Sequence, residues 1–255
     1  MQPNSVMFEV AICVLAYTAI LWIEFSPAFL ERFGFKNLRQ KLSKILFVII
    51  AIGVLLPTMH QSSLGTMAVV FGHQVSPLWQ TQLLPLLFLL SALMMGYAIV
   101  PFEGILASMG FRRVSETPLL GKLSRFMFVV LVSYLVIRIG DLTLRGAWGY
   151  AFEGTLDAFM FWVEMALFVV PVFILLNKSN QTNTRMIFIS ALCLLAAGTV
   201  YRMNVYLVGY HPGPDWSYYP SLAELMITIG MFSFEVVLYL IFVKRLPVLH
   251  RAEAT

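Results

Sequence analysis

Ionisable side chains interrupt stretches of sequence that are otherwise apolar. They are Glu9, Glu24, His60, Glu103, Arg138, Asp141, Glu164, Arg202 and Glu235. A charge in the hydrocarbon core of a bilayer costs at least about 2.5–3.5 kcal/mol, so such residues persist where they pair, face a wet cavity or handle protons. Carboxylates exchange protons, and an imidazole can also donate a hydrogen bond to a quinone carbonyl. We therefore expect the set to form a shared polar pathway inside a membrane.

The densest polar cluster surrounds His60, within the sequence LPTMHQSSLG at residues 56–65. Pro57 has no backbone N–H and frees a carbonyl in the preceding turn. Gln61 and two serines follow His60 directly. We expect local unwinding at Pro57 to create a concave site in which His60 binds a ligand. The alternative is a histidine that is satisfied between helices.

Arg138 and Asp141 are three residues apart, and on a helix they share one face. Either they form an internal ion pair that stabilises the bundle, or the pair also orients a ligand. Arg202 needs a carboxylate partner from another helix, and Glu164 is the candidate because its expected depth is similar.

Two carboxylates stand beside prolines at the expected inner ends of helices. Glu24 precedes Phe25-Ser26-Pro27, and Glu103 follows Pro101 closely. Both side chains could extend to the interface, as long charged side chains do near helix ends. The alternative is that they admit protons from the cytoplasm.

The elements that must position these residues are membrane-spanning helices. The chain of 255 residues is 60% hydrophobic and only 12% charged, with a mean hydropathy of +0.84. A soluble domain needs more charge to cover its surface. Apolar runs of about 20 residues can cross a bilayer. We expect an all-α integral membrane protein, forming a single transmembrane domain over residues 1–255, with seven helices at about 5–28, 45–71, 83–106, 123–146, 156–177, 185–209 and 222–244.

Alternate links between these runs are basic. Most lysines and arginines lie in the links at 31–44, 108–125 and 177–185 and in the tail from Lys244 onward, among them Arg112, Arg113 and Arg251. The links at 72–82, 146–155 and 210–221 contain none. Cytoplasmic loops of membrane proteins are enriched in Lys and Arg. The pattern predicts a periplasmic N-terminus and a cytoplasmic C-terminus.

The sequence offers few ligands for a metal or a haem. Of His60, His73, His211 and His250, only His60 lies well inside a span. A haem with two axial histidines therefore does not fit this chain, and we expect none. Cys13 and Cys193 are too few for an iron–sulfur cluster. No metal site is expected.

Several short motifs carry a resemblance to a known family. They are residues 4–9 (NSVMFE), 24–28 (EFSPA), 55–65 (LLPTMHQSSLG), 77–80 (PLWQ) and 161–164 (FWVE). They resemble the NrfD/polysulfide-reductase family of membrane subunits, and within it the membrane subunits of periplasmic nickel–iron hydrogenases. The resemblance runs from about residue 4 to residue 248. Members have about three further spans before the counterpart of Asn4, so the chain is expected to be a partial domain.

The resemblance implies an inner-membrane subunit of an oxidoreductase complex, either non-catalytic itself or reducing quinone. Its expected partners are a periplasmic iron–sulfur subunit and nickel–iron catalytic subunits, and its substrate is menaquinone or ubiquinone. Such subunits are often called b-type cytochromes although they generally hold no haem. The expected quinone-binding residues are His60, Glu9, Arg138 and Asp141. The expected proton-transfer residues are Glu24, Glu103 and Glu164.

Two other classes of function fit the same residues. Intramembrane carboxylates and proline-broken helices are also typical of secondary transporters and proton channels. The chain could also be a structural anchor that only attaches an enzyme to the membrane. The transporter hypothesis predicts activity from the chain alone, and the anchor hypothesis predicts that Glu24 and Glu103 tolerate change to glutamine.

Overall fold

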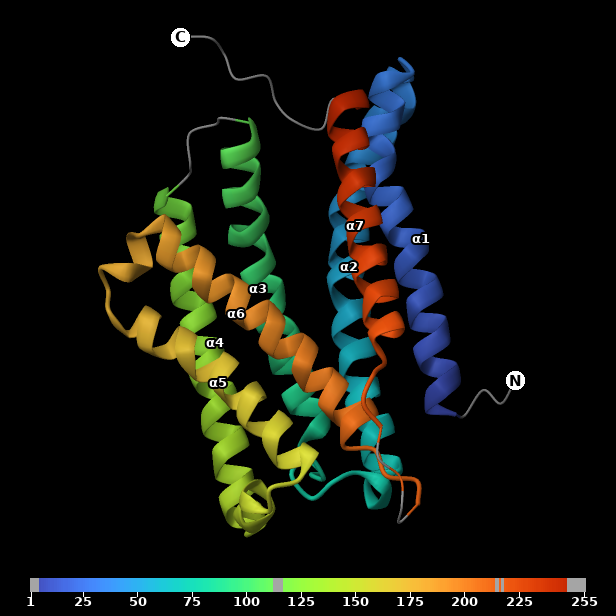
Figure 1. Cartoon of the computed structure of the whole chain (residues 1–255). Coiled ribbons are helices and arrows are strands. Elements are labelled where there is room, and N and C mark those ends of the chain that lie inside the picture. Colours follow the sequence, from blue (N-terminus) through green and yellow to red (C-terminus); the bar gives the residue numbers. More distant parts are fainter. Residues whose placement is uncertain (1–4, 112–116, 214–215, 217, 247–255) are drawn as a thin grey trace. The chain divides into compact units, whose positions relative to one another are not determined.

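Seven long apolar helices make up most of the computed structural model, which describes residues 5–111, 117–213, 216 and 218–246 (Figure 1). Their length and composition suit a membrane crossing, so the predicted all-α membrane class and the number of spans are confirmed. Asn4, Arg112, Arg113, His250 and Arg251 lie outside the described residues. The helices are α1 (Val6–Arg32), α2 (Lys36–Val70), α3 (Leu84–Phe111), α4 (Thr117–Leu144), α5 (Leu156–Leu176), α6 (Thr184–Met203) and α7 (Leu222–Arg245).

The first basic link is mostly helical. α2 begins at Lys36 rather than near residue 45, and only a short turn around Gly34 separates it from α1. Gly34 has a φ of +79°, a conformation that glycine adopts without steric cost. Lys, Arg, Gln and Leu are good helix formers, which explains why the helix starts early. At 35 residues α2 is about 50 Å long, so it is longer than the hydrocarbon core is thick.

The expected unwinding at Pro57 is wrong, because α2 continues through this residue without a break. A proline removes one helical hydrogen bond, here the bond to the carbonyl of Gly53, and the apolar turns on both sides keep theirs. The Thr58 hydroxyl also donates to the carbonyl of Leu55 at 2.6 Å. The polar cluster therefore sits on a continuous helix.

The chain divides into two compact units. Unit 1 contains residues 1–60 and 219–255, which include α1, α7 and the first part of α2. Its helices bury little surface within the structure, as expected of helices that face lipid: Cys13 is the one buried residue of α1, and α7 has none. Within this unit Phe25 and Phe29 of α1 pack against Phe242 of α7, with ring centroids 5.3 and 6.3 Å apart.

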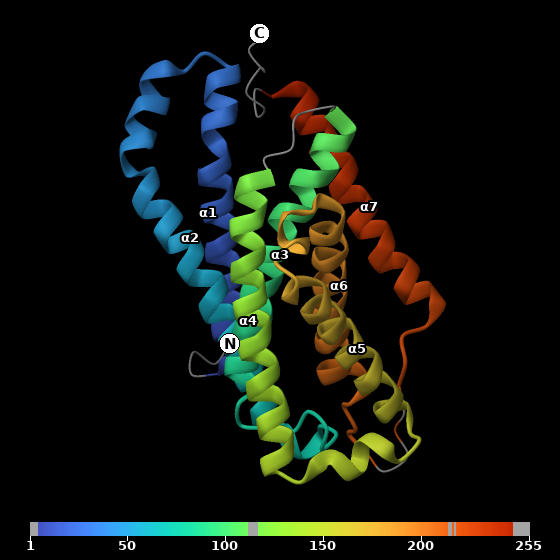
Figure 2. The same cartoon turned by 90° about the vertical axis from the view of Figure 1, so that its left-hand side faces the viewer.

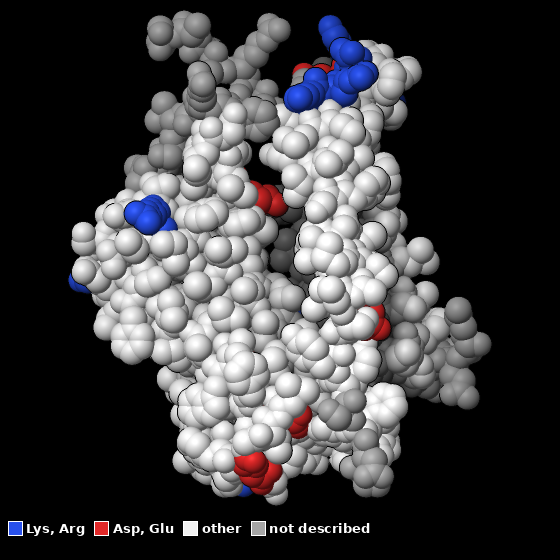
Figure 3. Space-filling view, viewed as in Figure 1, with Lys and Arg blue, Asp and Glu red and all other residues white. Residues whose placement is uncertain are grey.

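Unit 2 contains residues 61–218 and holds the core of the protein. α3, α4, α5 and α6 contact one another in a closed ring, α3 to α4, α4 to α5, α5 to α6 and α6 to α3 (Figure 2). Their shared interior is aromatic, and its largest members are Trp79, Phe88, Tyr134, Phe161, Phe168 and Tyr201. Charged atoms are sparse over the helices on the face shown in Figure 3, as a lipid-facing surface requires.

The last turns of α2 join unit 2 through a very close approach at Gly65. A Cβ placed on Gly65 would lie 2.5 Å from Cα of Pro85 and 2.7 Å from the carbonyl carbon of Leu84. Small residues let membrane helices approach at this distance. Gly65 therefore fixes the contact between α2 and the start of α3.

Three loops of unit 2 gather at one end, which we call the loop-rich end: residues 71–83, 145–155 and 209–213. Val75 and Tyr210 form an isolated antiparallel bridge, and Arg145 donates to the carbonyl of Pro77 at 2.8 Å. Two open cavities of about 330 and 450 Å³ lie here, and both are lined by Pro77 and Tyr150. On the predicted orientation this end is periplasmic.

Candidate functional site

A fully buried carboxylate lies at the centre of unit 2. Glu164 projects from α5 and has no exposed side-chain surface. Its Oε2 accepts hydrogen bonds from Nε1 of Trp79 and Nδ2 of Asn204, each at 2.8 Å. Asn204 opens a short π-helix (Asn204–Val208) at the end of α6. Such wide turns are frequent at functional sites, and this one carries the amide that holds Glu164.

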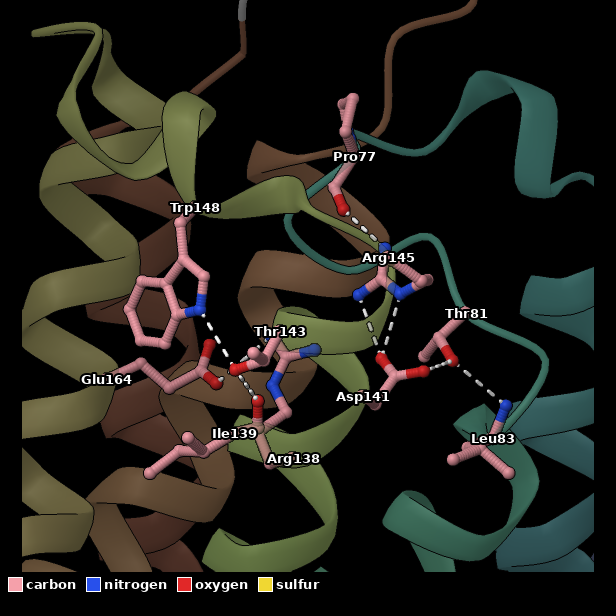
Figure 4. A network of polar contacts seen from close by, with 10 residues as sticks. All are labelled: Pro77, Thr81, Leu83, Arg138, Ile139, Asp141, Thr143, Arg145, Trp148 and Glu164. Atoms are coloured by element: carbon pink, nitrogen blue, oxygen red, sulfur yellow. Dashed lines mark hydrogen bonds and ion pairs between the residues drawn. The ribbon is translucent and has the colours of Figure 1, made fainter.

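Arg138 of α4 faces this carboxylate. Its Nη2 lies 3.8 Å from Oε1 of Glu164, and the side chain is 1% exposed (Figure 4). The rings of Phe161 and Tyr201 each have their centroid 5.9 Å from the guanidinium carbon. A buried ion pair costs desolvation on both partners, and removing one partner leaves an uncompensated charge. Arg138 and Glu164 therefore depend on each other.

Several polar atoms of this pair and around it make no hydrogen bond within the described part of the chain. They are the three side-chain nitrogens of Arg138, Oε1 of Glu164, Oδ1 of Asn204 and the hydroxyls of Tyr134 and Tyr201. Buried polar groups are normally bonded to protein or to ordered water. The centre thus combines a carboxylate, a cation and hydroxyls with bonding capacity for water or a polar ligand, and this is the chemistry that a site for proton exchange needs.

A second polar group lies beside it on α4 (Figure 4). Asp141 accepts from Thr81 at 2.7 Å and pairs with Arg145, whose Nη2 is 2.8 Å away. The predicted ion pair between Arg138 and Asp141 is therefore wrong, since each has its own partner. Arg145 lies one helical turn after Asp141 and reaches it, whereas the side chain of Arg138 points toward α5.

The guess that Glu164 pairs with Arg202 is also wrong. Arg202 donates to Oε1 of Gln61 at 2.9 Å and to the carbonyl of Gly198 at 2.9 Å. Sequence reasoning placed Arg202 and Glu164 at similar depths but could not give the direction in which each side chain points from its helix.

The other predicted site residues belong to other segments of the chain. Glu9, Glu24 and His60 belong to unit 1, and Glu103 is exposed on α3 of unit 2. Glu235 is exposed on α7. The structure brings Arg138 and Glu164 together, with Asp141 on the same helix, and the single shared pathway through all the predicted residues stays a prediction.

Glu24 lies against the backbone of α2 within unit 1. A Cβ on Gly53 would be 2.6 Å from its Oε1. The carboxyl group of Glu24 therefore packs against α2 where the missing side chain of Gly53 leaves room for it. Glu24 therefore contacts a neighbouring helix and does not only extend toward an interface.

Sequence reasoning missed Trp79 and Asn204, which hold Glu164, and Arg145, which holds Asp141. The tryptophan was visible in the PLWQ motif, but nothing in the sequence linked its indole to a residue 85 positions away. Asn204, a polar residue inside an apolar span, was a signal that could have been used.

A histidine at the loop-rich end ties loop 209–213 to α5. Nε2 of His211 is 2.9 Å from Oδ2 of Asp157, and Nδ1 is 3.1 Å from the carbonyl of Trp216. Burial alone lowers the pKa of His211, but the hydrogen bonds to Asp157 and Trp216 and the charge of Asp157 outweigh it, and the net pKa is raised above the usual value. The protonated form is therefore favoured in the folded loop.

This shift predicts a pH-dependent loop. A raised folded pKa stabilises the loop fully below the unfolded pKa of about 6.5, and the stabilisation is lost as the pH rises through the folded pKa. We expect amide exchange in residues 209–213 to be slower at pH 5.5 than at pH 8.5, after correction for intrinsic rates, with an effect below about 1 kcal/mol because the pair is partly exposed. The variant His211→Gln should lose the difference. An equal pH dependence in the variant would show that another group is responsible.

Two relatives extend over nearly the whole chain, although no family model matches it. The chain is 41% identical over 249 residues to the probable Ni/Fe-hydrogenase 2 b-type cytochrome subunit of Escherichia coli (strain K12), an alignment that covers 96% of this chain and 64% of that protein. The chain is homologous to this cytochrome subunit. The predicted resemblance to a nickel–iron hydrogenase membrane subunit is thereby confirmed, as is a multi-pass location in the inner membrane.

A second relative, from Nitratidesulfovibrio vulgaris (strain Hildenborough), is 30% identical over 258 residues and carries only the name "Protein". Its alignment covers 97% of this chain and 66% of the relative. The chain thus spans about two thirds of the length of the curated relatives it matches.

The name of the first relative implies a b-type haem. In this chain, histidines would have to supply its axial ligands. Two axial histidines would have to face each other across the bundle. His73 is exposed in a loop, and both ring nitrogens of His211 are engaged by Asp157 and Trp216. His60 is then the one described histidine within a span. The described histidines therefore do not fit a haem with two axial histidines.

Proposed function

We propose that the chain is the membrane subunit of a respiratory nickel–iron hydrogenase complex, and that it passes electrons from a periplasmic iron–sulfur subunit to menaquinone or ubiquinone. The observation that carries the proposal is the 41% identity to a hydrogenase b-type cytochrome subunit over almost the entire chain. Relatives this similar share a fold and usually a site, and the residues of the site must then supply the chemistry.

The polar centre of unit 2 supports this function. Reduction of a quinone consumes two protons with two electrons, so the membrane subunit must hold groups that exchange protons within the bilayer. The pair of Arg138 and Glu164, with two tyrosine hydroxyls nearby, is buried among four helices. It sits near the loop-rich end, to which Trp79 of the 71–83 loop connects it directly.

The proposed steps balance in electrons and protons. The catalytic partner oxidises one hydrogen molecule to two protons and two electrons, and the electrons pass through the partner's iron–sulfur centres. A quinone in the membrane accepts both electrons and two protons and becomes a quinol. We assign quinone binding to His60, Glu9, Arg138 and Asp141, and proton transfer to Glu24, Glu103 and Glu164.

The continuous course of α2 weakens the rival transporter hypothesis. That hypothesis drew on a broken helix at Pro57, and discontinuous helices are what many transporters use to build their substrate sites. A structural anchor remains distinguishable by experiment, because an anchor needs no protonatable side chains inside the bilayer.

The test uses membranes that contain the assembled complex. We expect His60→Ala and Glu9→Gln to lower hydrogen-dependent quinone reduction at least about 10-fold, the contribution typical of a positioned acid or base. Hydrogen-dependent reduction of a viologen dye reports the catalytic partner alone and should not change. The exposed Lys178→Gln serves as the control. Wild-type quinone rates in both variants, in fully assembled complexes, would refute the roles of His60 and Glu9.

A further inference from the structure

Arg202 carries a positive charge inside a span, and no described carboxylate of unit 2 forms an ion pair with it. Its hydrogen bonds go to neutral acceptors: Oε1 of Gln61, the carbonyl of Gly198 and, at 3.3 Å, the sulfur of Met95. Among the described residues of unit 2 no carboxylate lies within 4.0 Å of it. Arg138 and Arg145 in the same unit each face one. Within the described part of unit 2, Arg202 is thus a cation that neutral acceptors hold and no carboxylate neutralises.

The guanidinium of Arg202 also keeps free donors. Arginine has five N–H groups, and the three contacts use three of them, so two remain without a partner among the described residues. An arginine in the membrane with unused donors and an uncompensated charge is costly, and such residues mark ligand sites by default. The side chain is only partly buried, so a ligand could reach it from the surface of unit 2.

An aromatic cluster adjoins this cation through Phe88. The ring of Phe88 has its centroid 5.6 Å from the guanidinium carbon of Arg202. Tyr201 and Tyr206 lie against Phe88, with centroids 5.2 and 5.7 Å from it. The Tyr206 hydroxyl donates to the carbonyl of Leu64 on α2. A flat aromatic ligand would find stacking partners beside a cationic donor here.

This place adjoins the Glu164 centre, because Tyr201 packs against both Phe88 and Arg138. Arg202 and Tyr206 reach α2, through Gln61 and Leu64, whereas Asn204 between them reaches Glu164 of α5. Because the π-helix is a wide turn, neighbouring residues at this end of α6 contact both α2 and α5. Arg202 stands seven residues before Gly209, about 10 Å from the end of this helix, a depth at which a quinone head group can lie while its tail stays in the bilayer.

We propose that Arg202, oriented by Gln61, binds one of the two carbonyl oxygens of the quinone and stabilises the semiquinone anion. The inference rests on the proposed function and adds to it a residue and a role. The first electron converts the quinone to a radical anion, whose charge gathers on the carbonyl oxygen. The two free N–H groups of Arg202 can donate to that oxygen. The second electron and two protons complete the quinol, and the protons come from other groups, since arginine stays charged throughout.

The experiment uses the complete complex in membranes and compares Arg202→Gln with Arg202→Lys. We expect Arg202→Gln to raise the apparent KM for decylubiquinone or menadione at least about 10-fold, the loss typical of a charge-assisted hydrogen bond. The semiquinone radical signal, measured by electron paramagnetic resonance at controlled potential, should disappear. Arg202→Lys keeps the charge but loses the paired N–H donors of the planar guanidinium. This variant should retain the semiquinone signal and show a higher KM than wild type.

The control is Arg185→Gln, which removes an exposed cation from the opposite end of the same helix. It should match wild type in both readouts. An unchanged KM and radical signal in assembled Arg202→Gln complexes would overturn the inference. If that variant does not assemble, Arg202→Lys decides, because wild-type KM in the lysine variant would also overturn it. A wild-type complex that reduces viologen but no quinone would instead overturn the proposed function.

Discussion

Glu164→Gln is expected to lower the free energy of unfolding by about 3 kcal/mol or more, the usual cost of removing one partner of a buried ion pair. Glutamine keeps an oxygen that can accept from Trp79 and Asn204, so those two bonds survive in part. What is lost is the negative charge 3.8 Å from Arg138, which is 1% exposed and then has no ion-pair partner among the described residues. The measurement is reversible unfolding of the purified protein in detergent.

Matched variants separate the charge from the shape. Arg138→Met should cost less, because a carboxylate left alone can take up a proton whereas a guanidinium cannot give one up. The double variant Arg138→Met/Glu164→Gln should recover most of the loss, since apolar or neutral replacements of a buried pair are often tolerated. Glu153→Gln, at an exposed carboxylate, should change nothing. Additive effects of the two single variants would show that the charges do not interact.

Gly65→Ala is the second change with a large expected effect. The added Cβ would lie 2.5 Å from Cα of Pro85, and backbone cannot give way as a flexible side chain can. We expect α2 to be pushed away from α3, with a loss of about 1–3 kcal/mol in unfolding free energy, as for other overpacked cores. The same unfolding measurement applies.

Two other glycines calibrate this prediction. Gly96→Ala on α3 adds a Cβ with no atom within 4 Å and should be neutral or slightly stabilising. Gly198→Ala places its Cβ against the side chain of Met95, which can move, and should cost less than Gly65→Ala. Equal stability of Gly65→Ala and Gly96→Ala would mean that α2 and α3 do not meet as closely as described.

The spans were predictable because apolar runs of about 20 residues have no alternative to crossing a bilayer as helices. The ends of the helices were harder to predict. Good helix formers at residues 36–44 extend α2 toward its N-terminus, into a segment that hydropathy alone marks as a link. The unwinding predicted at Pro57 was wrong for a related reason. A proline removes one hydrogen bond, and a long helix with apolar turns on both sides tolerates that loss.

The candidate site was predictable in its residue types but not in its pairings. Sequence placed Arg138, Asp141, Glu164 and Arg202 in spans, and each does have polar partners. Depth along a helix follows from residue number, whereas the direction of a side chain depends on helix rotation and packing, so Glu164 was assigned to Arg202 rather than to Arg138. The π-helix at residues 204–208 changes the direction of the side chains that follow Arg202, and the sequence analysis did not predict it.

The most direct test of the central claim is hydrogen-dependent quinone reduction by the purified complex in liposomes, prepared with and without this chain. The account predicts that quinol forms only when the chain is present, while hydrogen-dependent viologen reduction is equal in both preparations. Equal rates of quinol formation with and without the chain would contradict it, because the electrons would then reach quinone by a route that this protein does not provide.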